Sequence, residues 1–363
     1  MSELVKVAHI IDVMDSGGIE AVVMNYYRHI DRKRVQFDFI TSDISKIPQK
    51  EEIESLGGKI YLVPRFTQLL KFNKSLKKIL KENNYDIVHC HMGTLALFPL
   101  RIAKKCGIKT RICHAHSTTN KKEWKRNLLK NILKPFSKIY ATDYFACGER
   151  AGRWLFGDKF FDKDNVVIMN NAIEIDRFKY SDSIRKSVRK ELEIEHNYVV
   201  GHIGRFVTQK NHNFLLEVFA DVVKSRPDAV LLLIGEGPLE KEMKEKAFSL
   251  GIAEKVKFLG VRKDCDKLYQ AMDVFALPSL YEGLPVVGVE AQCSGVKCVF
   301  SSETTKEILL NESSVMLDLN HTDWVEEILR ESKSSRVIND FKYDIVSNAN
   351  DITNYYIDLV GKK

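Results

Sequence analysis

Short apolar runs rich in β-branched residues alternate with longer amphipathic stretches along nearly the whole chain of 363 residues, and this alternation constrains the fold most. Apolar runs bounded by polar turns indicate buried strands, and the intervening stretches have the spacing of helices that cover a parallel sheet. The pattern therefore predicts the α/β class. The expected strands are residues 5–13, 36–41, 59–63, 87–91, 110–115, 143–147 and 166–169, followed by 198–203, 229–234, 256–259, 274–277, 297–301 and 314–317.

The chain is too long for one core, because a single core rarely exceeds roughly 250–300 residues. Each series of strands could supply a complete doubly wound sheet, and the polar stretch 171–183 between them has no apolar periodicity. We expect an N-terminal domain over 1–170 and a C-terminal domain over 171–343. The last amphipathic segment, 344–363, is expected to pack back on the first domain. Ligands of open α/β sheets bind beyond the carboxyl ends of the strands, so two facing sheets would enclose a cleft.

The composition is that of an ordinary globular protein, with 44% hydrophobic and 29% charged residues. No segment approaches the ~20 apolar residues that cross a bilayer. The first apolar run, 5–13, is interrupted by His9 and Asp12 and has no basic leader, so it is interpreted as a strand and not a signal peptide. We expect a cytoplasmic protein. Seven cysteines without a Cys-x-x-Cys pair disfavour a disulfide framework and a zinc site.

The formal charge of +7 is too small to indicate nucleic acid, and no nucleic-acid partner is expected. The basic residues gather between 121 and 140, where seven of them accompany one acid, Glu123. Apolar side chains recur among them at near-helical spacing. This pattern is typical of a helix on an anionic membrane surface, although a solvated helix that packs its apolar side on its own domain has it too.

Two glutamates, Glu282 and Glu290, bracket the run 283–289 just after the expected strand 274–277. Pro285 is expected at the first position of a helix, so the backbone N–H groups of Gly283 and Leu284 would favour an anion. Glu290 would lie roughly 7–8 Å further along that helix. This reach is comparable with the distance from a sugar, past a diphosphate, to a ribose, so the arrangement suits a nucleotide sugar.

Two cations, Arg205 and Lys210, follow the first strand of the second series. They are suited to neutralising a diphosphate, although two surface charges in a loop would have the same spacing. The turn 235–238 lacks the third glycine of the dinucleotide fingerprint, so NAD is disfavoured and Gly235 is assigned to close approach of backbone and ligand. Gly17 and Gly18 form either a plain turn or a site where phosphate or sugar meets the Gly18 N–H.

Histidines cluster at the ends of two neighbouring expected strands, as His89, His91, His114 and His116. They suggest a metal, but no carboxylate or cysteine spacing completes a recognised site, so no metal is expected. A single histidine that reaches the cleft as a hydrogen-bonding group is favoured. His116 is placed best, beside polar residues 117–119, and His114 remains the alternative.

Taken together, these motifs resemble those of the retaining glycosyltransferases of family 4, which have the GT-B fold of two Rossmann-like domains facing across a cleft. The resemblance spans nearly the whole chain and is strongest over 201–295. The segment 144–149 also resembles the family, although Gly148 stands where a serine is common. The motifs that carry the resemblance are Gly17-Gly18, His116, Gly204-Arg205 with Lys210, Gly235-Glu236-Gly237-Pro238, Pro278-Ser279 and the pair Glu282 and Glu290.

The resemblance implies a role for each matching residue. Arg205 and Lys210 would bind the donor diphosphate, Glu290 the ribose hydroxyls and Glu282 the donor hexose. The loop of Gly283, Leu284 and Pro285 would lie against sugar and phosphate, His116 would contact the donor sugar near the reacting carbon, and the backbone of Val261 and Arg262 would meet the nucleobase.

The resemblance also implies transfer of a sugar with retention of configuration and without a cofactor or divalent ion, because fixed positive groups stabilise the leaving nucleoside diphosphate. Same-face attack, with the leaving phosphate accepting the proton, is preferred over a double displacement on paired carboxylates. The chain looks most like bacterial enzymes of capsule, exopolysaccharide or lipopolysaccharide assembly. These move a hexose or N-acetylhexosamine, here from a UDP-linked donor, to lipid-linked saccharides at the inner face of the membrane. A UDP-sugar epimerase of the same fold and a non-catalytic nucleotide-sugar-binding protein are the alternatives.

Overall fold

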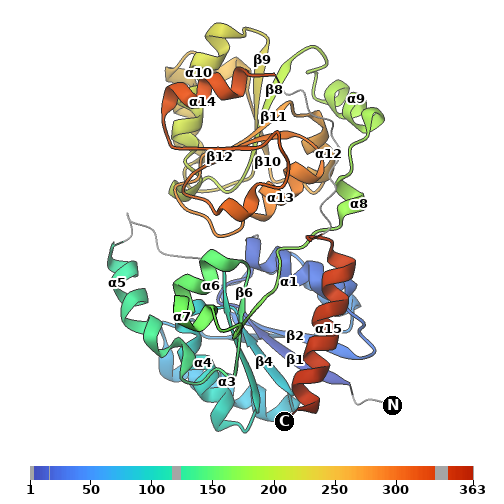
Figure 1. Ribbon diagram of the computed structural model, residues 1–363, viewed down its shortest axis with the longest axis vertical. Helices are drawn as coiled ribbons and strands as arrows, with labels where there is room; N and C mark the ends of the chain where they lie inside the picture. The colour runs from blue at the N-terminus through green and yellow to red at the C-terminus, as the bar shows by residue number, and fades with distance from the viewer. Residues whose placement is uncertain (1–3, 16, 117–123, 332–341, 363) are drawn as a thin grey trace. The chain divides into compact units, whose positions relative to one another are not determined.

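The computed structural model describes residues 4–15, 17–116, 124–331 and 342–362, without the side chains of 124–127 and 129. The chain forms two compact units (Figure 1). Unit 1 is Met1–Ile173 with Lys342–Lys363, and unit 2 is Glu174–Phe341. The boundaries expected from the sequence lie after residues 170 and 343. In the described part of the chain, no helix combines the length and the apolar character needed to span a bilayer.

Unit 1 contains a parallel sheet of seven strands in the order β3-β2-β1-β4-β5-β6-β7. Their continuous apolar runs are typical of strands buried on both faces. The order reverses between β1 and β4, which makes the sheet doubly wound. The strands are β1 Val5–Ile10, β2 Val35–Ser42, β3 Ile60–Val63, β4 Ile87–Cys90, β5 Thr110–Ala115, β6 Asp143–Ala146 and β7 Val166–Ile168.

Helices cover both faces of this sheet because side chains alternate along each strand. Ala8 and Ile10 of β1 join a core with α3 (Leu69–Asn83), α4 (Leu97–Lys105) and α6 (Glu149–Phe156). On the other face, α1 (Gly18–His29) lies beside α15 (Ile345–Gly361), whose buried Tyr356 packs against Phe37 of β2 (Figure 1). The remaining helical elements of unit 1 are α2 Lys50–Ser55, η1 Gly93–Ala96, α5 Trp124–Leu133, η2 Lys134–Lys138 and α7 Asp158–Phe161.

Unit 2 contains a second parallel sheet, of six strands in the order β10-β9-β8-β11-β12-β13. Its main core lies between the sheet and α10, α11 and α14, and α9 and α12 lie on the other side (Figure 1). The strands are β8 Tyr198–Ile203, β9 Ala229–Ile234, β10 Val256–Gly260, β11 Val274–Leu277, β12 Lys297–Ser301 and β13 Val315–Leu317. The helices are α8 Ile175–Phe178, α9 Asp182–Glu191, η3 Thr208–Lys210, α10 His212–Ser225, α11 Glu240–Ser249, η4 Ala253–Lys255, α12 Cys265–Ala271, α13 Val286–Cys293, η5 Lys306–Ile308 and α14 His321–Leu329.

The predicted strands are all present, with ends displaced by three residues or fewer. The largest displacement is at β1, which ends at Ile10 because its neighbour β4 ends at the paired residue, Cys90. The segment 171–183, which shows no apolar periodicity in the sequence, contains regular structure. It contains the single turn α8, with Phe178 buried, and the start of α9, whose N-cap Ser181 accepts the N–H of Ile184. One turn of helix is too short to show apolar periodicity.

Candidate active site

The loops that follow β8 and β11 form the centre of the candidate site. The strand order of unit 2 reverses between these two neighbours, and open α/β sheets bind ligands at such a point. Backbone and side-chain hydrogen bonds join the loops. Leu280 N–H donates to Gln209 O over 2.8 Å, Gln209 Nε2 donates to Tyr281 O over 3.0 Å, and Asn211 Nδ2 donates to Pro278 O over 3.2 Å. The two loops therefore hold one fixed geometry.

This geometry brings Lys210 and Glu282 together. Lys210 Nζ lies 2.6 Å from Glu282 Oε1, and Ser279 Oγ donates to the same oxygen over 3.1 Å. Both charged side chains are largely buried. Arg205, in the same loop as Lys210, is exposed and has no ion-pair partner among the described residues. The site thus offers one cation that is positioned by a carboxylate and a second that is available to an anion.

The loop after β9 supports this arrangement through two glycines. Gly235 has a φ of +136°, and a Cβ at this position would lie 2.3 Å from Gly204 O. A Cβ at Gly237 would lie 2.6 Å from Phe206 O. The close approach predicted at Gly235 is therefore made by protein backbone. Its N–H donates to Gly260 O over 2.8 Å and is used inside the protein.

Glu290 lies on α13, where Tyr269 OH donates to its Oε2 over 2.9 Å. Burial raises the pKa of this carboxyl to about 7. The prediction that Pro285 is the first residue of the helix is wrong by one position. Its φ of −74° suits a helix, but its ψ of 118° is extended, so Pro285 is the N-cap and α13 begins at Val286. Leu284 is buried in the preceding loop and Gly283 is partly buried.

The loop after β10 contains Val261 and Arg262. Val261 is exposed, whereas the Arg262 guanidinium donates to Asp264 over 2.8 and 2.7 Å and to Glu191 over 3.1 Å. Because its charge is neutralised by these carboxylates, Arg262 offers a ligand its backbone more readily than its side chain. The contact of this backbone with a nucleobase stays a prediction.

In unit 1, Gly17 is the N-cap of α1 and Gly18 its first residue, and the Glu20 carboxylate lies beside Gly17. The contact of phosphate or sugar with the Gly18 N–H stays a prediction. Glu20 Oε1 accepts the Asp15 N–H over 2.9 Å, and a Cβ at Gly17 would lie 2.6 Å from Glu20 Oε2. Burial raises the pKa of Glu20. Sequence reasoning missed this residue, although a glutamate at the third helical position is a recognised signal of a capped N-terminus.

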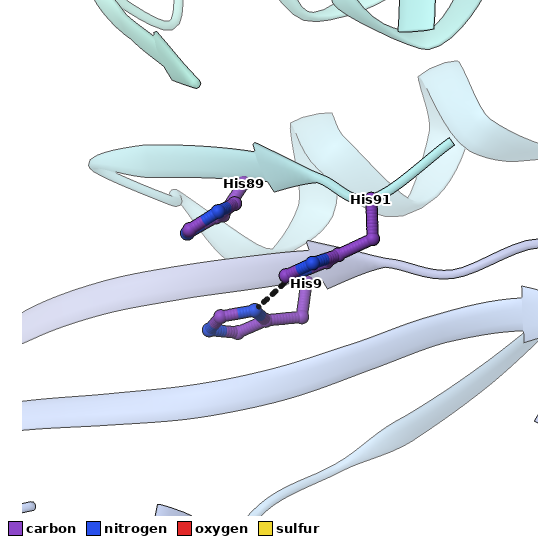
Figure 2. Close-up of side chains that lie close together, drawn as sticks. All are labelled: His9, His89 and His91. Carbon is purple, nitrogen blue, oxygen red and sulfur yellow. Dashed lines mark hydrogen bonds between the residues drawn. The ribbon is translucent and has the colours of Figure 1, made fainter. Parts of the chain in front are cut away.

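The histidines of unit 1 lie together at the carboxyl ends of β1, β4 and β5. His91 Nδ1 shares a hydrogen bond of 2.8 Å with His116 Nε2, and His91 Nε2 shares one of 2.9 Å with His9 Nδ1 (Figure 2). Of the two candidates His116 is partly exposed and His114 is fully buried, so His116 is the one that can meet a ligand. His9 was not predicted, because its proximity depends on β1 lying beside β4.

The basic segment 121–140 contains α5 and η2, and residues 121–123 lie outside the described part. Leu128, Ile132, Phe136 and Ile139 are exposed, with 44–56% of each residue accessible. Lys134 Nζ lies 5.3 Å from the centre of the Trp154 ring. Since α5 and η2 also contact η1, α4 and α6 of unit 1, both predicted interpretations of the basic segment, a helix on a membrane surface and a helix packed on its own domain, stay predictions.

A hollow of about 380 Å³ lies at the amino ends of the strands of unit 2, where β8, β11 and β12 begin. Its cations are held by protein carboxylates: Arg189 Nη2 lies 2.9 Å from Asp273 Oδ2, and Lys297 Nζ lies 2.6 Å from Glu327 Oε1. The residues predicted to bind a nucleotide sugar in unit 2 follow the carboxyl ends of the strands, so the hollow is separate from them.

Comparison with known proteins identifies the family. The profile described as Glycosyltransferase Family 4 matches residues 16–177, and that of Glycosyl transferases group 1 matches residues 183–329. The EpsF protein of Bacillus subtilis (strain 168), named as a glycosyltransferase, is 34% identical over 97% of this chain and 96% of its own. The chain belongs to glycosyltransferase family 4 and is a glycosyltransferase.

A second relative agrees with this assignment, and a solved structure shows the fold. The UDP-Gal:alpha-D-GlcNAc-diphosphoundecaprenol alpha-1,3-galactosyltransferase of Escherichia coli is 24% identical over 99% of this chain and 98% of its own. The crystal structure of Anabaena Alr3699/HepE in complex with UDP and glucose has a TM-score of 0.75 at 19% identity, covering 99% of this chain and 97% of that one. The predicted family, its GT-B fold of two Rossmann-like domains and the enzyme class are therefore confirmed.

The raised pKa of Glu290 predicts how the stability of this glycosyltransferase depends on pH. The unfolded carboxyl ionises near 4.5 and the folded one near 7, so the stabilisation by the protonated carboxyl is full below pH 4.5 and is lost as pH rises to 7. A shift of this size corresponds to at most about 3 kcal/mol, and part exposure reduces it.

We expect Glu290→Gln, which stays neutral, to be more stable than the wild type above pH 7 and to show a smaller decline in stability between pH 4.5 and 7. Urea unfolding of both proteins across this range, without donor, measures the difference. A constant difference over the whole range would contradict the raised pKa.

Proposed function

We propose that this glycosyltransferase moves a hexose or N-acetylhexosamine from a UDP-linked donor to a lipid-linked or oligosaccharide acceptor, with retention of anomeric configuration. The observation that carries the proposal is the meeting of Lys210 and Glu282 at the reversal of strand order, with the exposed Arg205 in the same loop. The name of the Escherichia coli relative, which specifies a UDP-sugar and a lipid-diphosphate acceptor, supports the choice of both substrates.

In the proposed reaction Arg205 and Lys210 bind the diphosphate and stabilise the negative charge that develops as UDP leaves. Fixed cations cost no reorganisation at that moment, so no divalent ion is required. Glu282 binds the donor hexose, Glu290 the ribose hydroxyls, and His116 the sugar near the reacting carbon. The leaving phosphate accepts the proton of the acceptor hydroxyl, which attacks the same face of the sugar.

We propose that the product is part of a capsule, exopolysaccharide or lipopolysaccharide and that the enzyme works in the cytoplasm, at the inner face of the membrane. A lipid-linked acceptor requires this location, and the exposed apolar side chains of α5 and η2 lie among lysines that an anionic surface would attract.

Thermal unfolding in the presence of UDP-, GDP- and ADP-sugars tests the donor. A ligand at ~100 times its dissociation constant stabilises by about 2.7 kcal/mol, so the correct donor should stand out from the panel. NMR of the product then tests retention, because the anomeric configuration of the new linkage should match that of the donor. An inverted linkage, or stabilisation by none of the UDP-sugars, would refute the proposal.

Membrane contact predicts a specific loss of vesicle binding. Reversing Lys130 and Lys134 to Glu removes two attractive charges and adds two repulsive ones, and each basic residue near an anionic surface contributes about 1 kcal/mol. We expect affinity for phosphatidylglycerol vesicles to fall roughly 30-fold or more, measured by co-sedimentation.

The matched control for this experiment changes an exposed apolar residue elsewhere. Phe248 in unit 2 is 79% accessible, and Phe248→Ser should leave vesicle binding unchanged. Undiminished binding of the doubly reversed protein would show that α5 and η2 do not contact the membrane.

A further inference from the structure

Three histidine rings of unit 1 form a chain that ends at the partly exposed His116. His9 Nδ1 and His91 Nε2 are 2.9 Å apart, and His91 Nδ1 and His116 Nε2 are 2.8 Å apart. The chain begins in β1, passes through the residue that follows β4 and ends at the residue that follows β5. Figure 2 shows the first of these bonds, with the His89 ring stacked beside that of His91.

The rings are arranged to share protons and not a metal ion. Two groups of histidines have ligand atoms within 4.8 Å of one another, as a metal site requires: His9, His89 and His91, and His91, His114 and His116. In the second group the His114 and His116 rings stack at 3.9 Å with an inclination of 28°, and the hydrogen bond of 2.8 Å already joins His91 to His116. The His89 and His91 rings, however, are inclined by only 9° and stack at 4.4 Å, so their in-plane lone pairs run side by side and do not converge. The 2.9 Å between His9 and His91 is a hydrogen-bond distance, whereas two imidazole nitrogens on one zinc ion lie roughly 3.3 Å apart.

Counting protons gives the chain a direction. Burial lowers the pKa of His9 and His116 to about 3 and that of His91 well below its usual value, so each ring is neutral at pH 7 and carries one N–H. Two of the three N–H groups make the two hydrogen bonds. The third must lie at one end of the chain, on His9 Nε2 or on His116 Nδ1.

The surroundings of His9 decide between these ends. His9 Nε2 is buried without a hydrogen-bond partner in the described part of the chain, and the ring lies 4.1 Å from that of Phe37. A buried N–H without an acceptor is rarer in proteins than an acceptor without a donor. The free proton therefore belongs to the partly exposed end. His9 donates to His91, His91 donates to His116 Nε2, and His116 keeps its proton on Nδ1.

We infer that His91, held by His9, is a positioning residue that fixes His116 as the Nδ1–H tautomer and so presents a neutral hydrogen-bond donor to an oxygen of the donor sugar. The contact with sugar rests on the proposed function, whereas the tautomer does not. A neutral donor in a fixed orientation binds a hydroxyl oxygen without accepting its proton. His116 would thus orient the sugar and not act as a general base.

The tautomer is measured by ¹⁵N NMR of the full-length protein labelled at histidine. The signals of His116 are identified as those that disappear in His116→Gln. We expect Nδ1 of His116 to be protonated and Nε2 to be bare at pH 7. His91→Leu removes the donor and should move the proton of His116 largely to Nε2. His91→Asn, whose amide N–H can replace the Nδ1–H of His91, should restore the wild-type tautomer.

A second run of hydrogen-bonded side chains in unit 1 provides the matched control. Tyr356 OH lies 2.6 Å from His89 Nδ1, and His89 Nε2 lies 2.9 Å from His114 Nδ1. Tyr356→Phe changes only this run and should leave the tautomer of His116 unchanged. A wild-type His116 protonated on Nε2 would overturn the inference, as would an unchanged tautomer in a folded His91→Leu. Loss of the His9 and His91 hydrogen bonds on addition of one equivalent of Zn²⁺ would overturn it in favour of a metal site.

Kinetics separate the two parts of the inference. With the donor found by the thermal screen, we expect kcat/KM of His91→Leu to fall up to about tenfold, the usual range for one hydrogen bond, and that of His91→Asn to recover. If the tautomer changes as expected while His91→Leu keeps full activity, the contact with sugar is wrong. If no donor is used at all, the proposed function fails and the tautomer is still decided by NMR.

Discussion

Replacing Lys210 with alanine is expected to lower turnover about 10²–10³-fold, the usual effect of removing one preorganised group that stabilises developing negative charge. Lys210 Nζ contacts Glu282 Oε1 at 2.6 Å, so the loss has a second consequence. Glu282 is only 11% accessible at its side chain and would lose its counter-charge, which costs up to about 3–5 kcal/mol for a buried pair. Low activity of Lys210→Ala alone could therefore reflect unfolding of unit 2.

The double variant Lys210→Met with Glu282→Gln separates these effects because it removes both charges together. We expect it to unfold near the wild-type temperature and to bind UDP poorly by isothermal titration calorimetry. Glu282→Gln alone is the matched control. It should retain UDP binding, since Glu282 is assigned to the sugar and Lys210 to the phosphate. Wild-type UDP affinity in the folded double variant would show that Lys210 does not bind phosphate.

Replacing Gly235 with alanine is expected to have the largest effect on stability, about 3–5 kcal/mol. A Cβ would meet Gly204 O at 2.3 Å, and backbone atoms cannot move aside as a flexible side chain can. The φ of +136° adds backbone strain for any residue with a Cβ. The loop that begins at Gly204 carries Arg205 and Lys210, so UDP affinity should fall as well. Urea unfolding and UDP titration measure the two effects.

Gly251 provides the control for backbone strain alone. Its φ is +70°, yet a Cβ at this position would meet nothing within 4 Å. Gly251→Ala should cost only about 1–2 kcal/mol and leave UDP binding intact. If Gly235→Ala is no more destabilising than Gly251→Ala, the contact between the loops after β8 and β9 is not tightly packed.

The strands could be predicted from sequence because parallel strands buried on both faces form continuous apolar runs. The runs 198–203, 229–234 and 274–277 match β8, β9 and β11 at both ends. Their order in the sheet could not be predicted, since any neighbour would bury these runs equally well. The helical turn α8 was missed because four residues are too few for a periodic signal.

The same distinction applies to the candidate site. Motif order located Lys210 and Glu282, but their ion pair depends on β8 lying beside β11. His9 was missed because its contact with His91 exists only once β1 and β4 are neighbours. Glu20 could have been found, since its signal lies within one turn of helix. Sequence thus locates groups near one another in the chain, and the fold decides which distant groups meet.

The position of α15 has a consequence for synthesis of the protein on the ribosome. Unit 1 consists of Met1–Ile173 and Lys342–Lys363, and Tyr356 from the second piece packs against Phe37 and His89 of the first. At 5–20 residues per second, roughly 10–35 s pass between translation of Ile173 and that of α15. Unit 2 can fold in this interval, while the face of the first sheet that α1 covers still lacks its second helix, α15. The first half of the enzyme to be translated is therefore the last to be completed, and its exposed apolar face is the surface that a chaperone would have to protect.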